Sequence, residues 1–298
     1  MRLMSSTQNY NRGFTILEMM VTLSIMMCVS GILVSSFKTI LYSLRKDYIR
    51  TSLNQNLRTS ADIMGASIRI GGENLSNNFP AFILTNGSGT AADQITVRRS
   101  VISEVLPVCT TVNSATTTDR IFFANTGSTQ GCSHTSNLSI YNAWRTYRLN
   151  NGNTVKAYIF NMSTKYGEFI NYTGEANLGT SLYITRGSGA LTGSYPAGAS
   201  TVYLLEDWKY IIEDNTLKLV EYNDSSTKKN INFNTKNIQV YFVLNDGTVR
   251  ESFGVNDDWS KISAVSTTIY GSENYRDTTV EKKITTSFFP RNVLSFMR

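Results

Sequence analysis

The sequence predicts an α+β fold in which a long N-terminal helix packs along its second half on an antiparallel β-sheet domain. Residues 14–37 form an apolar run with one charged residue, Glu18, and no proline, and helix formers continue to Gly71-Gly72. The C-terminal third alternates short β-branched and aromatic runs with turn signals such as Asn245-Asp246-Gly247. With 41% hydrophobic and 17% charged residues, the 298-residue chain has the composition of a globular protein.

The N-terminal run predicts a membrane span. Its 24 positions would extend roughly 36 Å as a helix, enough to cross a hydrocarbon core of about 30 Å. A polar leader, residues 1–13, precedes it and carries Arg2 and Arg12 but no acid. Positive charge beside a span marks the cytoplasmic side, so we expect the body of the protein to lie across the membrane.

Glu18 is the exception within this run. An acidic residue at the centre of a span costs about 2.5–3.5 kcal/mol to insert, and near one end it is tolerated if it reaches the interface, is protonated or meets a cation. Two interpretations remain open on spacing alone. The carboxylate either contacts interfacial water or has a dedicated partner.

The second half of the helix, residues 38–72, is predicted to be amphipathic. Apolar residues recur at fours and sevens, at Ile49, Leu53, Leu57, Met64 and Ile68. A single helix over residues 14–70 would be roughly 85 Å long. The alternative is two helices with a break near Gly31 or Lys38.

Residues 73–200 are predicted to be a loop-rich β insertion or variable region. They are rich in Ser, Thr, Asn and Gly, and hold short β-branched and aromatic runs. The candidate strands are Gln94–Arg99, Asp119–Ala124, Asn142–Leu149, Thr154–Phe160, Ser181–Thr185 and Thr201–Leu205.

Residues 201–298 are predicted to form an antiparallel meander, with one face available for the apolar stripe of the helix. The expected strands are Trp208–Glu213, Leu217–Tyr222, Ile238–Leu244, Thr248–Phe253, Trp259–Tyr270 and Lys282–Phe289. The first two and the next two are expected to form hairpins.

The chain has three cysteines. Cys28 lies inside the apolar run, where we expect it to be a small residue buried in the membrane. If the body lies outside the cytoplasm, a disulfide between Cys109 and Cys132 is favoured, and it could contribute on the order of 3 kcal/mol. Zinc is disfavoured because only two sulfurs and His134 are near one another in sequence.

The stretch from Gly13 to Leu23, GFTILEMMVTL, resembles the class III signal of type IV pilins and pseudopilins. The resemblance implies that a prepilin peptidase cleaves between Gly13 and Phe14 and methylates the new N-terminus at Phe14. It also implies that Glu18, the fifth mature residue, neutralises the terminal amine of a neighbouring subunit during assembly. Removing the 13-residue leader from 298 residues leaves 285.

Two further segments are similar to PilW-type minor pilins and J-type pseudopilins. One is the basic, apolar helix end that closes on Gly71-Gly72, and the other is the order of C-terminal strands ending at Arg291-Asn292. The resemblance implies a pilin-like fold and a minor pilin of a type IV pilus, placed at or near the tip. There it would prime pilus assembly and support adhesion and twitching motility.

The resemblance also implies a single-pass inner-membrane protein with a periplasmic domain that later enters the extracellular pilus. Its expected partners are the prepilin peptidase/methyltransferase, other minor and major pilins, the inner-membrane assembly platform and the membrane itself. The alternatives are a J-type pseudopilin of a type II secretion system, or a single-span membrane-anchored periplasmic adhesin or sensor domain. An exported hydrolase with an uncut anchor is disfavoured.

Catalysis is not expected. The one histidine, His134, lies in a loop-like stretch, and no phosphate-binding, zinc-protease or nucleophile-elbow motif is present. We expect no cofactor or metal. Asp257 and Asp258 could ligate calcium together with Glu251, but their spacing is not that of an EF-hand. The net charge of +6 comes from scattered residues, which disfavours a nucleic-acid partner.

Overall fold

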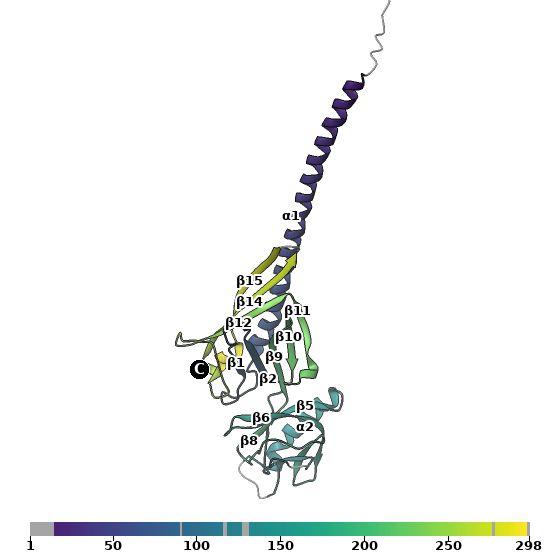
Figure 1. Cartoon of the computed structure of the whole chain (residues 1–298). Coiled ribbons are helices and arrows are strands. Elements are labelled where there is room, and N and C mark those ends of the chain that lie inside the picture. Colours follow the sequence, from purple (N-terminus) through teal and green to yellow (C-terminus); the bar gives the residue numbers. More distant parts are fainter. Residues whose placement is uncertain (1–14, 90, 116–117, 127–130, 276–277, 297–298) are drawn as a thin grey trace, which may run out of the picture. The chain divides into compact units, whose positions relative to one another are not determined.

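The computed structural model describes residues 15–89, 91–115, 118–126, 131–275 and 278–296. Its first element is a single helix, α1 (Ile16–Ile70), so the predicted long helix is confirmed and has no break at Gly31 or Lys38 (Figure 1). Contacts divide the chain into two compact units, one ending at Ser52 and one beginning at Leu53. The boundary falls inside α1.

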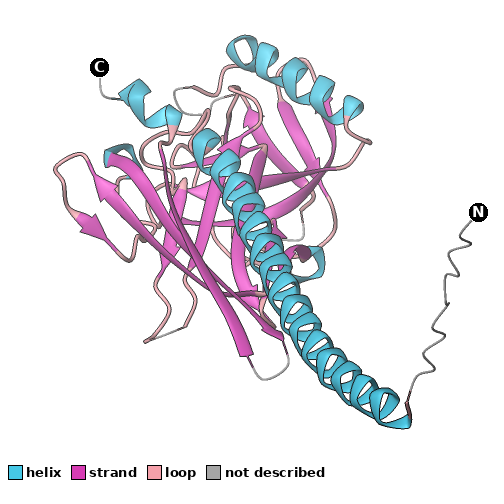
Figure 2. Cartoon of the chain, turned by 90° about the horizontal axis from the view of Figure 1, so that it is seen from above, coloured by secondary structure: helices cyan, strands magenta, loops and turns pink. Residues whose placement is uncertain are grey.

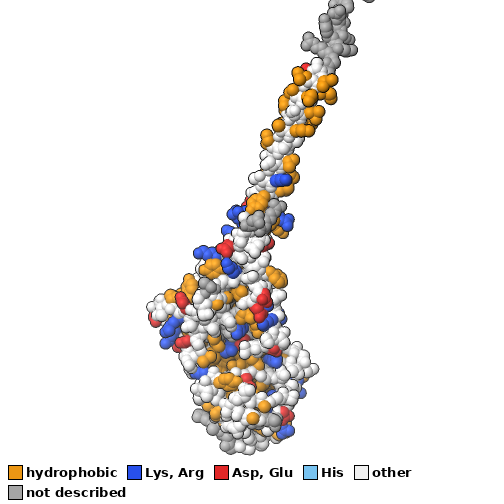
Figure 3. Space-filling view, viewed as in Figure 1, with side chains coloured by type: hydrophobic (Ala, Val, Ile, Leu, Met, Phe, Trp, Pro, Cys, Tyr) orange, Lys and Arg blue, Asp and Glu red, His pale blue; other side chains and the backbone are white. Residues whose placement is uncertain are grey.

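In the first unit, α1 exposes its apolar side chains. Every residue from Thr15 to Leu41 is exposed, and Ile16 and Phe37 have 82% and 62% of their surface accessible. Figure 3 shows these side chains as an orange band along the helix. The segment is long and apolar enough to cross a membrane. A helix satisfies its own backbone hydrogen bonds, so it can lie in lipid. Its exposed apolar side chains are more favourable in an apolar environment than in water.

In the second unit, the last turns of α1 supply the predicted stripe to a β-sheet core. Leu53, Leu57, Met64 and Ile68 are completely buried. Burying one such side chain is worth about 1.5–3 kcal/mol. Two polar contacts fix the position of α1 along the strands on which it packs. The hydroxyl groups of Ser67 and Tyr210 lie 2.7 Å apart, and the Asn232 amide donates to the Ser60 hydroxyl oxygen (2.9 Å).

Two antiparallel sheets belong to this core (Figures 1 and 2). The five-stranded sheet has the order β1-β2-β9-β10-β11, with β1 (Phe82–Thr85), β2 (Gln94–Ser100), β9 (Leu205–Glu213), β10 (Thr216–Glu221) and β11 (Lys229–Phe233). The four-stranded sheet has the order β13-β12-β14-β15, with β12 (Thr235–Leu244), β13 (Val249–Arg250), β14 (Ile262–Tyr275) and β15 (Thr278–Phe288). Short 3-10 helices η1 (Ser225–Thr227), η2 (Trp259–Lys261) and η3 (Arg291–Phe296) join or end these strands. Both predicted hairpins are present, as β9–β10 and β12–β13.

A third sheet and a second helix form a lobe between β2 and β9, which we call the insertion lobe (residues 101–204). Its six strands have the order β3-β8-β5-β6-β7-β4. They are β3 (Leu106–Pro107), β4 (Arg120–Ala124), β5 (Val155–Asn161), β6 (Tyr166–Asn177), β7 (Leu182–Arg186) and β8 (Ser200–Tyr203), and the helix is α2 (His134–Asn150). The lobe has a hydrophobic cluster of its own, in which Trp144 and Tyr172 are completely buried.

One predicted strand in this region is wrong. Residues 142–149 lie in α2, not in a strand. The buried residues of α2 are Asn137, Tyr141 and Trp144, at helical spacings of four and three. The aromatic residues of this segment favoured a strand by propensity, but their spacing is that of a helix whose one face packs on the sheet.

The insertion lobe leaves and re-enters the core at a single point. Ser100, the last residue of β2, is paired with Leu205, the first residue of β9. The Val101 N–H also donates to the carbonyl of Leu204 (2.9 Å). Residues 73–100 therefore contribute β1 and β2 to the core, so the inserted element starts later than the predicted boundary at residue 73.

Aromatic and charged contacts hold the lobe against the core. The ring of Phe79 lies 4.8–5.9 Å from the rings of Tyr158, Phe160 and Tyr203. Beside them, the Arg98 guanidinium donates to Asp207 (2.6 Å) and lies over the Tyr158 ring. Both partners of this buried ion pair lie in core strands, Arg98 in β2 and Asp207 in β9, and removing one of them would cost about 3–5 kcal/mol. The pair holds the Arg98 guanidinium in place, and its contact with the Tyr158 ring joins the core to the lobe.

Candidate functional site

The start of α1 is organised by a reciprocal contact between Thr15 and Glu18. The Thr15 N–H and hydroxyl donate to the Glu18 carboxylate, at 3.0 and 3.1 Å, and the Glu18 N–H donates to the Thr15 hydroxyl oxygen (3.3 Å). This is a capping box, in which the residue before the helix and the third helical residue satisfy each other's free groups. It explains locally why the helix begins at Ile16.

The predicted cleavage site is adjacent to this cap. Gly13 and Phe14 lie outside the described residues, and Thr15 is the first described residue. If the chain is cut after Gly13, the new amine belongs to the residue directly before the cap. Glu18 would then be the fourth residue after the new terminus in the chain.

The Glu18 carboxylate has acceptor capacity beyond the cap. Both hydrogen bonds from Thr15 reach the same oxygen, Oε2, and a carboxylate offers about four lone-pair sites. The side chains around it, such as Ile16, Leu17 and Met19, are apolar and exposed. The site is therefore a carboxylate held in place at the end of an apolar surface. Such a carboxylate can accept a charge-assisted hydrogen bond from an ammonium group of another chain.

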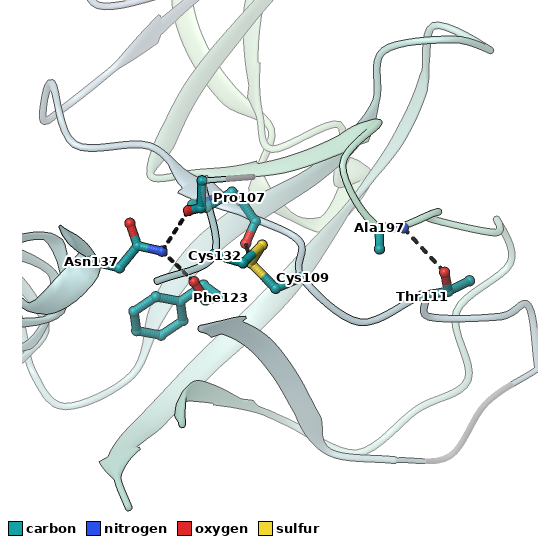
Figure 4. Close-up of a disulfide and its surroundings, with 8 residues drawn as sticks. Pro107, Cys109, Thr111, Phe123, Cys132, Asn137 and Ala197 are labelled. Carbon is teal, nitrogen blue, oxygen red and sulfur yellow. Dashed lines mark hydrogen bonds between the residues drawn. A yellow bond between two sulfur atoms is a disulfide. The ribbon is translucent and has the colours of Figure 1, made fainter. Parts of the chain in front are cut away.

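Cys109 and Cys132 form the predicted disulfide, with their Cα atoms 5.7 Å apart (Figure 4). Cys109 follows β3, and Cys132 lies just before α2. Asn137, in the first turns of α2, donates to the carbonyl oxygens of Phe123 (2.5 Å) and Gly131 (2.9 Å). The disulfide attaches the start of α2 to the segment after β3, and the buried amide attaches it to β4. Cys28 is free and exposed on α1.

The other side chains considered from sequence have local structural contacts. His134 Nε2 lies 2.8 Å from the Asn177 side-chain oxygen. Asp257 accepts from the Gly254 N–H (2.6 Å), and Asp258 accepts from Ser260 at the start of η2. Within the described part of the chain, no three His, Cys, Asp or Glu side chains lie close enough together to hold a metal ion.

A buried ion-pair network in the insertion lobe was not predicted. Arg148 contacts both oxygens of Glu175 (2.7 and 2.8 Å), and the Tyr172 hydroxyl donates to the same carboxylate (2.5 Å). Burial alone would raise the pKa of Glu175, but the hydrogen bonds from Arg148 and Tyr172 outweigh it and lower that pKa. Arg148 lies in the last turn of α2, within the residues 142–149 for which the sequence predicts a strand, so its partner on β6 is not visible in the sequence.

A similar arrangement surrounds Glu168. Its carboxylate accepts hydrogen bonds from the N–H groups of Thr192 and Gly193, and from the Tyr195 hydroxyl (2.8 Å). Burial opposes ionisation, but these donors outweigh it and lower the pKa of Glu168. The first network fixes the end of α2 to β6, and the second fixes the loop at residues 192–195 to β6.

Comparison with known proteins gives one result. The prokaryotic N-terminal methylation motif matches residues 8–34, which include Gly13, Phe14 and Glu18. No curated protein and no solved structure matches the chain.

The motif, the apolar helix behind it, the antiparallel domain and the disulfide fit together. The long helix with its apolar first half can anchor a single-pass protein with a C-terminal domain. The methylation motif supports a type IV pilin-like or pseudopilin protein.

Proposed function

We propose that this protein is a minor pilin of a type IV pilus, held in the inner membrane as a prepilin and incorporated at or near the filament tip. The observation that carries the proposal is the match of the methylation motif to residues 8–34, with Glu18 as a fixed anion on the first turn of an exposed apolar helix. The role is structural and adhesive rather than catalytic.

Assembly follows from the surface of the first unit. In the membrane, lipid chains cover the apolar side chains of α1. In a filament, the equivalent surfaces of neighbouring helices cover them instead. A lone carboxylate and a lone ammonium are both costly in such surroundings, and each supplies what the other lacks. The pair between Glu18 and a neighbour's N-terminal amine therefore sets the register of insertion.

The processing enzyme, the neighbouring pilins and the assembly platform are partners in this proposal. The insertion lobe supports a tip position. Subunits of the shaft must pack side by side at every step, whereas a subunit at the tip has room for residues 101–204. The disulfide inside this lobe fits a domain that folds on the oxidising side of the membrane.

The experiment that tests the role is a deletion combined with filament purification. The proposal predicts peptides of this protein in purified pili, fewer pili after deletion, and loss of twitching motility. Loss of exoprotein secretion with normal pili would instead identify a J-type pseudopilin. A deletion that leaves pili and secretion intact, with the protein found only in membranes, would favour an anchored adhesin or sensor domain.

A further inference from the structure

A mixed polar and apolar cleft lies where the insertion lobe joins the core. We call it the Tyr147 cleft. It has a volume of about 290 Å³ and is lined by Val101, Tyr147, Asn151, Thr154, Val155, Lys156, Leu204, Leu205, Glu206 and Tyr222. These residues come from the end of α2, the start of β5, the crossing into β9 and the turn after β10.

Two tyrosine side chains in the cleft have unused hydroxyl groups. Tyr147 and Tyr222 are partly buried, and in the described part of the chain neither hydroxyl makes a hydrogen bond. The Tyr222 ring is fixed by edge contact with Phe169, 5.5 Å away. Burial and the nearby Glu206 carboxylate raise the pKa of both phenols, so both stay protonated and available as donors.

Glu206 supplies an oriented acceptor. Its Oε2 atom accepts from Arg99 (2.6 Å), and Arg99 also contacts Glu73 (3.0 Å) and lies over the Trp208 ring. The second oxygen, Oε1, has no hydrogen-bond partner among the described residues. The carboxylate is therefore held in place by one oxygen while the other can accept from a ligand.

The rest of the lining divides into a floor and a rim. Leu204 and Leu205 are buried aliphatic residues, and Asn151, Thr154 and Lys156 are exposed polar residues. Asn151 is itself oriented, because its amide donates to the Tyr147 carbonyl (2.8 Å). Apolar surface, aromatic rings and separate donors and acceptors thus converge on one small volume.

This chemistry selects among ligand classes. An anion is disfavoured because Arg99 is already neutralised by Glu206 and Glu73, and the lining itself holds one cation, Lys156, and one carboxylate, Glu206. A purely apolar ligand would leave the polar rim without partners. The volume lies near the lower end of the range for ligand sites, so it fits one ring.

We propose that the Tyr147 cleft binds one neutral saccharide ring. The C–H face of the sugar packs on the tyrosine rings and the leucine floor. Glu206 Oε1 accepts from sugar hydroxyls, and the Tyr147 and Tyr222 hydroxyls and Lys156 donate to the ring oxygen or to hydroxyl oxygens of the sugar. The proposal deepens the adhesive part of the proposed function and rests on it for the origin of the sugar, a polysaccharide on the surface that the tip touches.

The test uses the full chain in lauryldimethylamine oxide, a detergent without a sugar headgroup. Saturation-transfer NMR is recorded with glucose, galactose, mannose, N-acetylglucosamine and N-acetylgalactosamine. We expect transfer from at least one sugar with a Kd on the order of 1 mM. Tyr147→Ala and Tyr222→Ala should each weaken binding about tenfold, which corresponds to roughly 1.4 kcal/mol.

The matched control is Tyr166→Ala, which removes an exposed tyrosine of the same lobe outside the cleft. It should bind as the wild type does. If Tyr147→Ala does not fold, Tyr147→Phe removes the hydroxyl alone and should still weaken binding severalfold.

No transfer from any of these sugars at about 10 mM would overturn the proposal, as would binding that both alanine variants leave unchanged. Because the measurement needs neither processing nor filaments, its outcome is independent of whether the protein is a pilin.

Discussion

The side-chain amide of Asn292 donates to the carbonyl oxygen of Ile70 (3.1 Å), 222 residues earlier, and to that of Gly71 (3.2 Å). The last carbonyls of a helix have no partner within the helix, so this contact caps α1 from the C-terminal end of the chain. A second contact joins the end of α1 to the C-terminal strand β15. The Arg69 guanidinium lies over the Phe288 ring, 5.3 Å from the ring centre.

Asn292→Ala should therefore destabilise the second unit by about 1–2 kcal/mol, because both carbonyls lose a partner. The measurement is chemical denaturation of the full chain in detergent. Asn230→Ala, on the exposed part of edge strand β11, is the control and should be neutral. An Asn292→Ala protein as stable as the wild type would show that water replaces the cap without cost.

Removing the disulfide should weaken the insertion lobe. A chain with both Cys109→Ser and Cys132→Ser loses a closed loop of 23 residues, which corresponds to about 3 kcal/mol in the chain-entropy model. Limited proteolysis should cut the lobe before the core in this variant. Cys28→Ser is the control, since Cys28 is unpaired on α1. Unchanged protection of the lobe would mean that its own hydrophobic cluster suffices.

The lobe should lose stability in acid. The folded state lowers the pKa of Glu175 below its ordinary value of 4.5, so the folded chain binds fewer protons there than the unfolded chain does. The contribution of Glu175 to the free energy of unfolding is therefore fully present above the pKa of the unfolded state. It is lost as the pH falls through the pKa of the folded state. Glu168 acts in the same direction.

Thermal unfolding between about pH 7 and pH 3 measures this effect. Glu175→Gln keeps the shape of the side chain but cannot ionise, so this variant should be less stable at neutral pH and should lose less stability on acidification. If the unfolding temperatures of the wild type and the variant fall by the same amount as the pH is lowered, this pH dependence does not come from Glu175.

Glu18→Val should leave leader cleavage intact but reduce incorporation into filaments at least tenfold, since removing one partner of a buried charge pair typically costs about 3–5 kcal/mol. Thr15→Val is the informative control. It removes the hydroxyl part of the cap while keeping the carboxylate, so it should assemble normally. If Thr15→Val fails as severely as Glu18→Val, the role of Glu18 is to start the helix and not to pair with a neighbour.

The helix, its apolar stripe and the C-terminal hairpins could be predicted because each depends on local periodicity or turn chemistry. The positions of Leu53 and Ile68, or the Asn245-Asp246-Gly247 turn, are visible in a short window. The disulfide could be proposed because Cys109 and Cys132 are the two cysteines outside the apolar run.

The insertion lobe could not be predicted in the same way. The aromatic residues of α2 also fit a strand, and the three-four spacing of its buried residues distinguishes a helix only once the sheet beneath it is known. The pairing of Ser100 with Leu205, the Glu175 network and the Tyr147 cleft all join residues distant in sequence. Nothing in a local window marks such contacts.

Mass spectrometry of the N-terminal peptide of the protein isolated from cells tests directly whether this chain is a processed pilin. We expect a chain that begins at N-methylated Phe14, and a Gly13→Val variant that retains its leader. A functional chain that still begins at Met1, or a Gly13→Val variant that is processed normally, would show that the protein is not a pilin.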